Sequence, residues 1–321
     1  MPSARWQKRL KSFTKQSEEG TDTMPYQPDI LIYHDNCDDG FAAAWAANKK
    51  WGDNLEYVAS NYGRDLPHMD VAGKDLLIAD FSLKPEVCKE IAERGGRIVM
   101  LDHHKTAQDA LSGLHSVVRP TIDNIERCFA RMSGTWREKV LVEFDMKRSG
   151  ARMLWDFAFP GELVPALICA VEDRDLWLFN RADTKLVSMY LRSLDRDFTQ
   201  WDAAVRLYEE NNDQFLVEAN AIKRFYDQRI KAICETAGIQ HFYGHDGVPV
   251  TYTCPYDFVS DTCHTLLAMH PEAPFAVAVI RNQEGVTYSL RSDDARVDVS
   301  EIAKANGGGG HRNAAGFRVA T

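Results

Sequence analysis

The feature that most constrains the fold is a repeated unit of strand, polar turn and helix in the first third of the chain. The apolar run 29–34 leads through turn formers into the helix-forming run 41–47, and strands at 74–79 and 97–101 flank a helix at 85–93. Such alternation is typical of a parallel sheet with helices on its faces. The sequence therefore predicts an α/β fold, with a parallel sheet in the N-terminal domain.

The rest of the chain predicts helices followed by a smaller α/β domain. We interpret 120–143 as an insertion or connecting helix, 149–155 and 162–171 as helices, and 199–236 as one long helix or a helical hairpin. Behind these we expect a hairpin at 240–253, a helix at 261–269, strands at 275–280 and 286–291, a helix at 299–305 and a strand at 317–320.

These elements divide into four segments. We expect a basic N-terminal tail at 1–24, a parallel-sheet domain at 25–195, a helical linker at 196–237 and the smaller domain at 238–321. The tail fits a disordered segment or an upstream start codon, and a transit peptide or a nucleic-acid-binding arm is the alternative.

Composition narrows the class of protein. Asp and Glu number 47 against 38 Lys and Arg, a net charge of −9, which argues against a protein that coats duplex nucleic acid. The longest apolar runs, 163–171 and 273–280, fall short of the roughly 18 residues that span a bilayer. The seven cysteines contain no C-x-x-C pair and no secretory segment precedes them, so we expect a cytoplasmic protein.

Polar side chains follow three successive predicted strands. In an open α/β sheet, the ligand crevice lies at the carboxyl ends of the strands, so these side chains are expected to share a pocket. They are His34, Asp38 and Asp39 after the first strand, Asp80 after the second, and Asp102, His103 and His104 after the third. Carboxylate with imidazole suits Mn²⁺, Fe²⁺, Co²⁺ or Zn²⁺. Many carboxylates around few histidines favour a site for two metal ions.

A glycine run near the C-terminus is the second candidate site. The segment 307–316 begins with four glycines, whose backbone N–H groups can approach an anion closely, and His311 follows them. Arg291 and Ser292 end the preceding predicted strand, and arginine offers a fork of donors to phosphate.

Taken in order, these motifs resemble the DHH phosphoesterase superfamily with a C-terminal DHH-associated domain. The resemblance covers 29–321 and rests on the following segments: His34-Asp-Asn-Cys-Asp-Asp-Gly40, Ile78-Ala-Asp-Phe-Ser82, Asp102-His-His104, Glu172-Asp-Arg-Asp-Leu-Trp177 and the glycine-histidine motif at 307–316. It implies two divalent ions, with Mn²⁺ expected.

The resemblance also implies roles for single residues. Asp102, His103 and His104 are the expected catalytic residues. The expected metal ligands are His34, Asp38, Asp39, Asp80, Asp102, His103 and Asp173. The expected substrate-binding residues are Arg291, Ser292, Gly309, Gly310 and His311. Two choices stay open: Asp38 against Asp39, with Asp39 favoured, and Asp173 against Asp175.

Two other residue types have less specific interpretations. Trp45, Trp51, Trp155 and Trp177 are expected to pack in the core or between domains, with base stacking as the alternative. Nothing in the sequence activates Cys37 as a nucleophile.

The expected function is a metal-dependent phosphodiesterase that hydrolyses short single-stranded oligonucleotides or dinucleotides to mononucleotides. The alternatives are a RecJ-like single-strand exonuclease, a hydrolase of cyclic dinucleotides or 3′-phosphoadenosine 5′-phosphate, and an inactive nucleotide-binding module. A RecJ-like enzyme usually carries a further oligonucleotide-binding domain, for which we expect no room after Gly316. No membrane partner is expected, and a homodimer is left open.

Overall fold

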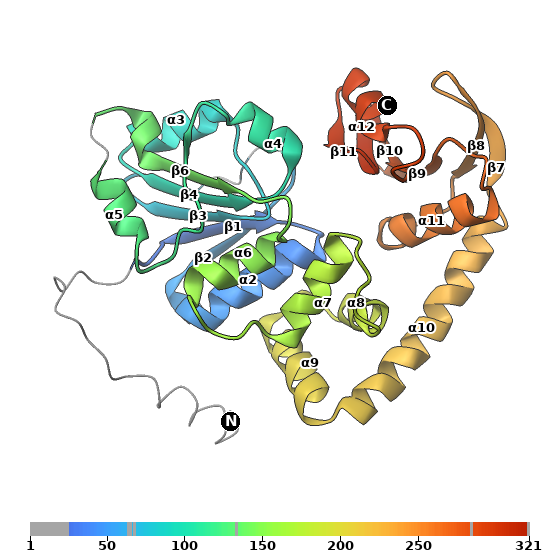
Figure 1. Ribbon diagram of the computed structural model, residues 1–321, viewed down its shortest axis with the longest axis horizontal. Coiled ribbons are helices and arrows are strands. Elements are labelled where there is room, and N and C mark those ends of the chain that lie inside the picture. Colours follow the sequence, from blue (N-terminus) through green and yellow to red (C-terminus); the bar gives the residue numbers. More distant parts are fainter. Residues whose placement is uncertain (1–25, 63–65, 67–68, 132–133, 283–284, 320–321) are drawn as a thin grey trace.

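The chain forms two six-stranded sheets, one in each half, surrounded by helices (Figure 1). The computed structural model describes residues 26–62, 66, 69–131, 134–282 and 285–319, so the predicted tail at 1–24 lies outside the described residues.

The first sheet is parallel throughout and has the order β2-β1-β3-β4-β6-β5. Its strands are β1 (Ile30–His34), β2 (Glu56–Ser60), β3 (Asp75–Ala79), β4 (Arg97–Asp102), β5 (His115–Ser116) and β6 (Val140–Phe144). The predicted α/β class with an N-terminal parallel sheet is confirmed.

Both faces of this sheet are buried, because successive side chains of a strand point to opposite sides. Leu77 packs with α2 (Asp38–Trp51) and α6 (Gly150–Ala158), whereas the next residue, Ile78, packs with α3 (Pro85–Glu93) on the other face. The five alanines of α2 are all buried, and their small side chains let this helix lie close to α6. Because both faces are buried, the sequences of the central strands are continuous apolar runs.

Two five-residue strands of the first sheet are absent from the sequence prediction. β6 lies at the end of 120–143, which we expected to be an insertion or a connecting helix, and that expectation is wrong for this end of the segment. Its apolar residues follow directly on a charged 3₁₀ helix, Trp136–Lys139, which hides the strand in the pattern. β2 is an edge strand whose mixed burial gives only a weak apolar signal.

Four helices connect the first sheet to the second: α7 (Ala166–Asp175), α8 (Thr184–Arg192), α9 (Phe198–Glu210) and α10 (Asn212–Cys234). Helices α4 (Lys105–Ala110) and α5 (Ile125–Ala130) and a 3₁₀ turn at Gly52–Asn54 instead connect strands of the first sheet. The predicted helical stretch at 199–236 is thus two helices, broken at Asn211, whose side chain accepts a hydrogen bond from the Gln214 backbone N–H. In Figure 1, α10 runs from the end of α9 to the second sheet.

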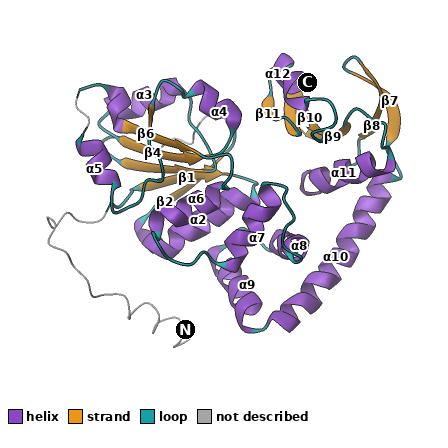
Figure 2. Cartoon of the chain, in the orientation of Figure 1, coloured by secondary structure: helices purple, strands orange, loops and turns teal. Residues whose placement is uncertain are grey.

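The second sheet is mixed, with the order β11-β12-β10-β9-β8-β7 (Figure 2). Its strands are β7 (Gly238–Phe242), β8 (His245–Thr251), β9 (Ala276–Asn282), β10 (Gly285–Arg291), β11 (Gly309–His311) and β12 (Ala314–Val319). Helices α11 (Val259–Met269) and α12 (Val299–Ala305) and the 3₁₀ turn Tyr256–Phe258 accompany it. Among the described residues, no helix has the length and apolar character needed to cross a membrane.

Candidate metal centre in a cleft between the two sheets

Three neighbouring strands of the first sheet end side by side in residues that can bind metal. β1 ends at His34, β3 is followed by Asp80, and β4 ends at Asp102. Parallel pairing of β1 with β3 and of β3 with β4 brings these ends to one edge of the sheet. The cleft between the two halves, about 1260 Å³ in volume, opens at this edge.

Two glycines allow helices to approach these strand ends closely. A Cβ at Gly40, in the first turn of α2, would lie 2.1 Å from the carbonyl oxygen of His34. A Cβ at Gly150, at the start of α6, would lie 2.4 Å from the Cβ of Asp80. Asp80 itself has a φ of 54°, a left-handed conformation that costs energy in a residue with a side chain. Two glycines and a strained backbone at Asp80 thus bring the starts of α2 and α6 close to His34 and Asp80.

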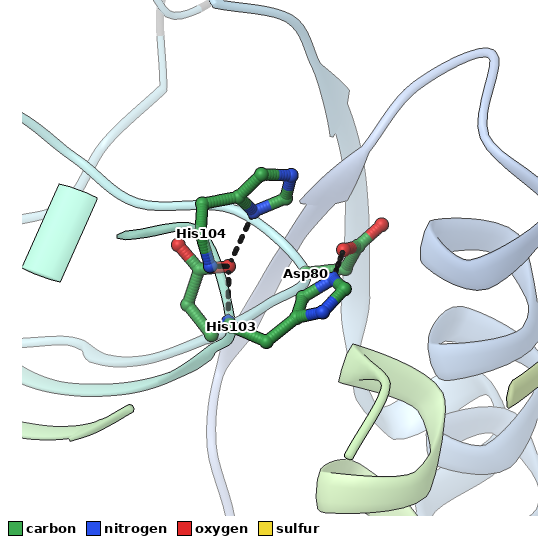
Figure 3. Close-up of side chains that lie close together, drawn as sticks. Asp80, His103 and His104 are labelled. Atoms are coloured by element: carbon green, nitrogen blue, oxygen red, sulfur yellow. Dashed lines mark hydrogen bonds and ion pairs between the residues drawn. The ribbon is translucent and has the colours of Figure 1, made fainter. Parts of the chain in front are cut away.

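His103 lies among three carboxylates. Its Nε2 lies 3.0 Å from Asp80 Oδ1, 3.5 Å from Asp175 Oδ2 and 3.8 Å from Asp39 Oδ2. Figure 3 shows the His103 ring directed at the Asp80 carboxylate. His103, Asp39 and Asp80 are almost fully buried. A histidine with three carboxylates is a ligand set suited to a divalent transition metal.

A second group of potential ligands lies on the other side of the Asp80 carboxylate. The Nδ1 of His34 and the Oδ2 of Asp80 are 3.5 Å apart, and both atoms are buried. Neither has a hydrogen-bond partner among the described residues. Buried polar atoms without partners are costly, and a bound cation would satisfy both at once. The residues present therefore fit a metal ion. The Sγ of Cys37 belongs to the same group, within 4.8 Å of the other ligand atoms.

Asp39 is held by the start of α6. Its Oδ2 accepts a hydrogen bond from Gly150 N at 2.6 Å, and its Oδ1 accepts one from Ala151 N at 3.1 Å. Burial raises the pKa of Asp39 well above its usual value, and the charges of Asp80 and Asp175 add to this. A cation bound beside Asp39 would favour its charged form.

Asp102 orients the two histidines that follow it. Its Oδ1 accepts from His103 N at 2.7 Å and lies 2.6 Å from His104 Nδ1, and its Oδ2 accepts from Ser82 Oγ at 2.5 Å. Asp102 is fully buried and also lies within the metal-binding group formed with Asp80, His103 and His104. Although burial opposes it, Asp102 raises the pKa of His104. Because Nδ1 contacts Asp102, Nε2 is the nitrogen with which His104 can contact a ligand.

Burial and nearby charged groups also act on Asp80 and Cys37. Although burial opposes it, the neighbouring imidazoles of His103 and His34 hold the pKa of Asp80 well below its usual value. Burial, followed by the charge of Asp80, raises the pKa of the Cys37 thiol well above its usual value.

Asp173, an expected metal ligand, lies away from the cluster. Its carboxylate accepts hydrogen bonds from Asn180 N at 2.9 Å, Arg181 N at 3.1 Å and the Thr184 hydroxyl. These contacts fix the loop between α7 and α8. Asp175, the alternative that the sequence left open, contacts His103 instead and replaces Asp173 in the candidate ligand set.

Asp38 is likewise used elsewhere. Its Oδ2 accepts from Arg192 Nε at 2.7 Å, and Arg196 lies 3.8 Å from its Oδ1. None of the metal-binding groups among the described residues contains it. The expectation that Asp38 is a ligand is therefore corrected, and Asp39 is the acid of this motif that reaches the cluster.

The opposite wall of the cleft carries Arg291 and His311. The guanidinium of Arg291 hydrogen-bonds to Ser289 Oγ at 3.0 Å, Leu290 O at 2.9 Å and Ser260 Oγ at 3.1 Å, all of them neutral groups. Burial lowers its pKa, and the charge of Arg174 acts in the same direction. A guanidinium in these surroundings is suited to bind an anion.

His311 links this wall to the metal-binding cluster. Its ring stacks on His104, with centroids 5.2 Å apart. Burial and the neighbouring His104 and His103 lower the pKa of His311 to about 4. Gly309 and Gly310 line the same cleft, in the short edge strand β11.

Ser292 does not offer a free hydroxyl to a ligand. It is fully buried, its Oγ donates to Val297 O at 2.6 Å, and its N–H donates to Asn313 O at 2.9 Å. These bonds tie the end of β10 to the loop that follows it and to the turn between β11 and β12, so the expected substrate-binding role of Ser292 is corrected to a structural one.

The tryptophans pack as expected. Trp45 and Trp155 stack on one another in the core with centroids 6.4 Å apart, and Trp51 is buried. Trp177 lies between the two halves, stacked on His264 at 4.1 Å and covered by the Arg174 guanidinium at 4.4 Å.

No known protein-family profile matches the chain. The uncharacterized protein R106 of Acanthamoeba polyphaga mimivirus is 28% identical over 309 residues, which cover 91% of this chain and 67% of that protein. Among solved structures, the DHH domain of a member of a family of ribosomal proteins has a TM-score of 0.47 and 13% identity, covering 91% of this chain and 82% of that one.

A pGpG-specific phosphodiesterase from Vibrio cholerae has a TM-score of 0.42 and 12% identity, covering 91% of this chain and 93% of that one. At such TM-scores and identities, function has to be inferred from the side chains of the cleft.

Proposed function

We propose that this chain is a metal-dependent phosphodiesterase of the DHH type that hydrolyses short oligonucleotides or linear dinucleotides to mononucleotides. The observation that carries the proposal is the pair of buried atoms His34 Nδ1 and Asp80 Oδ2, which lie 3.5 Å apart and have no hydrogen-bond partner among the described residues. They belong to a cluster of acids and imidazoles that faces Arg291 across the cleft.

The side chains divide into two ligand groups that share Asp80. Its Oδ2 faces His34, and its Oδ1 faces His103, which also contacts Asp39 and Asp175. A carboxylate shared in this way is what a site for two divalent ions requires, with Mn²⁺ suited to the group rich in oxygen. When bound, two such ions supply a hydroxide nucleophile and stabilise charge on a phosphoryl group.

The remaining residues orient the substrate. Asp102 fixes His104 through Nδ1, so the Nε2 of His104 is available to a phosphate oxygen at the edge of the cluster. Arg291 and His311 on the opposite wall would hold the far end of the substrate, where a second phosphate fits the neutral surroundings of the guanidinium. The chain thus binds both ends of one short phosphodiester.

Cleft size favours a short substrate over a polymer. Pockets for drug-sized ligands measure about 300–1,000 Å³, and this cleft, at about 1260 Å³, is somewhat larger. Its two walls also meet at the stacked rings of His104 and His311. A substrate of a few nucleotides fits this enclosure, whereas a RecJ-like exonuclease needs an open path for a long strand.

The test is a substrate series on metal-stripped protein with Mn²⁺ added back. We expect mononucleotides from linear dinucleotides and short single strands, with a rate that falls steeply as the strand lengthens. Sustained cleavage of long strands would favour the RecJ-like alternative, and the series should include cyclic dinucleotides and 3′-phosphoadenosine 5′-phosphate. Tight nucleotide binding without turnover in Mn²⁺ would instead identify an inactive binding module and contradict the proposal.

A further inference from the structure

Cys37 occupies a position that its own helix does not explain. It is the N-cap residue of α2, with extended backbone angles of −122° and 135°. Ser, Thr, Asp and Asn are preferred there because their oxygens accept a backbone N–H, and each adds about 1 kcal/mol over alanine. The Cys37 side chain makes no such capping bond. The chain therefore carries a weak cap where a better one would fit.

The surroundings of Cys37 differ from those of the other described cysteines. Its Sγ, a ring nitrogen of His34 and a carboxylate oxygen of Asp80 all lie within 4.8 Å of one another. It is the one cysteine that joins a metal-binding group among the described residues. By contrast, Cys234 and Cys254 direct their thiols to Thr262, at 3.7 Å and 3.6 Å.

The atoms beside the thiol indicate a ligand. Asp80 is 1% exposed, and its Oδ2 faces His34 Nδ1 without a hydrogen-bond partner among the described residues. Cys37 is itself only partly buried and lines the cleft. Sulfur, imidazole nitrogen and carboxylate oxygen thus converge on one point that an ion can reach.

We propose that Cys37 is a metal ligand, so that the two ions of the proposed centre occupy unlike sites. The ion beside His34, Cys37 and Asp80 has a sulfur, a nitrogen and an oxygen ligand, which favours Zn²⁺, Co²⁺ or Fe²⁺. The ion beside Asp39, His103 and Asp175 has mainly oxygen ligands, which suit Mn²⁺. The Cys37 thiol releases its proton to solvent as the metal–sulfur bond forms.

This inference rests on the proposed metal centre, but it can be tested without turnover. Co²⁺ bound by a thiolate gives a sulfur-to-metal charge-transfer band in the near ultraviolet, and Zn²⁺ bound by one gives a sulfur shell at about 2.3 Å in X-ray absorption. We expect both signals from the metal-stripped full chain reloaded with Co²⁺ or Zn²⁺.

Two variants and a matched control complete the experiment. Cys37→Ser should lose the cobalt band and the sulfur shell. It should also bind Zn²⁺ at least about tenfold more weakly, because substitution of a residue that only supports a metal ligand already weakens metal binding by about this factor. Its metal-free form should melt at or above the wild-type temperature, because serine is a better N-cap. Cys37→Ala should lose the same two signals. Cys169→Ser, at a half-buried cysteine outside the cluster, should keep them.

The outcomes separate this inference from the proposed function. Wild-type protein without the cobalt band, or Cys37→Ser protein that keeps it, overturns the assignment of Cys37. If the protein shows the cobalt band but cleaves no phosphodiester with any metal, Cys37 remains a metal ligand and the proposed function is contradicted. If the protein cleaves phosphodiesters but shows no cobalt band, the proposed function stands and Cys37 is not a metal ligand.

Discussion

At the scale of single residues, Asp80 is the side chain on which the candidate centre depends. One carboxylate oxygen lies 3.0 Å from His103 Nε2, and the other lies 3.5 Å from His34 Nδ1. Because both imidazoles favour its charged form, Asp80 stays ionised in a site where burial acts against charge. It can therefore serve both ligand groups at once.

Asp173 and Asp175 show what the sequence could not decide. They stand two positions apart in α7, so their side chains leave the helix about 200° apart. One direction leads to the loop before α8, and the other leads to His103. The run Glu-Asp-Arg-Asp names both acids as candidates, but the choice depends on how α7 is rotated against the sheet, which only tertiary packing sets.

The two acids should respond differently to the same substitution. Asp175→Asn should lower metal-dependent turnover by at least roughly 10–100-fold with little change in melting temperature, because it removes a candidate ligand whose contact is with His103 of the same cluster. Asp173→Asn should mainly lower the free energy of unfolding, by about 1–3 kcal/mol, because it disturbs an acceptor of buried donors. Turnover assays and thermal melts of both proteins check this, and the reverse pattern would restore Asp173 as the ligand.

At the scale of elements, the start of α6 is the support of the centre. Its first two backbone N–H groups hold Asp39, and its first residue, Gly150, lies against Asp80. The positive end of the helix dipole stabilises the Asp39 carboxylate where burial and neighbouring acids oppose it. One helix terminus thus positions two of the candidate ligands.

Gly150→Ala tests that support. The new Cβ would overlap Asp80, so α6 has to move away and Asp39 loses its two donors. We expect weaker metal binding, measured by calorimetry, and a loss of about 1–3 kcal/mol of stability, the usual cost of overpacking. Gly113→Ala is the control, because a Cβ there meets no atom within 4 Å. Wild-type metal affinity in Gly150→Ala protein would contradict the role of α6.

Elements were predictable where burial on both faces gives an unbroken apolar run. β1, β3 and β4 have this character. Predicting these strands also placed His34, Asp80 and Asp102, because these residues stand at the strands' carboxyl ends. The sequence did not reveal β2, at the sheet edge, because its side chains alternate between core and solvent without a clear apolar run. The edge strand β11 was likewise hidden, because glycines carry no side-chain pattern.

At the scale of the whole molecule, a few ion pairs hold the two walls of the cleft together. Arg174 of α7 binds Asp261 of α11 with both ends of its guanidinium, at 3.1 Å and 2.6 Å. Tyr226 of α10 donates to the same carboxylate at 3.0 Å, and Arg192 of α8 lies 3.9 Å away. Asp261 is therefore the acid at which the first half, the long helix and the second half meet.

This meeting point predicts how the cleft responds to acid. Although burial opposes it, Arg174 holds the pKa of Asp261 below the usual 3.8. A carboxyl whose folded pKa is lowered stabilises the protein fully above its unfolded pKa, and this stabilisation is lost as the pH falls through the folded value. Metal-free protein should therefore open in acid, seen as a rise in the radius of gyration by small-angle X-ray scattering.

Asp261→Asn should show the open form already at neutral pH and change less in acid. Because Arg174 is then left without its carboxylate, the free energy of unfolding should fall by up to about 3–5 kcal/mol, as for other buried ion pairs that lose one partner. Asp246→Asn is the matched control, because Asp246 pairs with His241 on an exposed hairpin, where an ion pair contributes about 1 kcal/mol or less. If Asp261→Asn protein has the wild-type radius of gyration and unfolding free energy at neutral pH, contacts other than those of Asp261 hold the two walls of the cleft together.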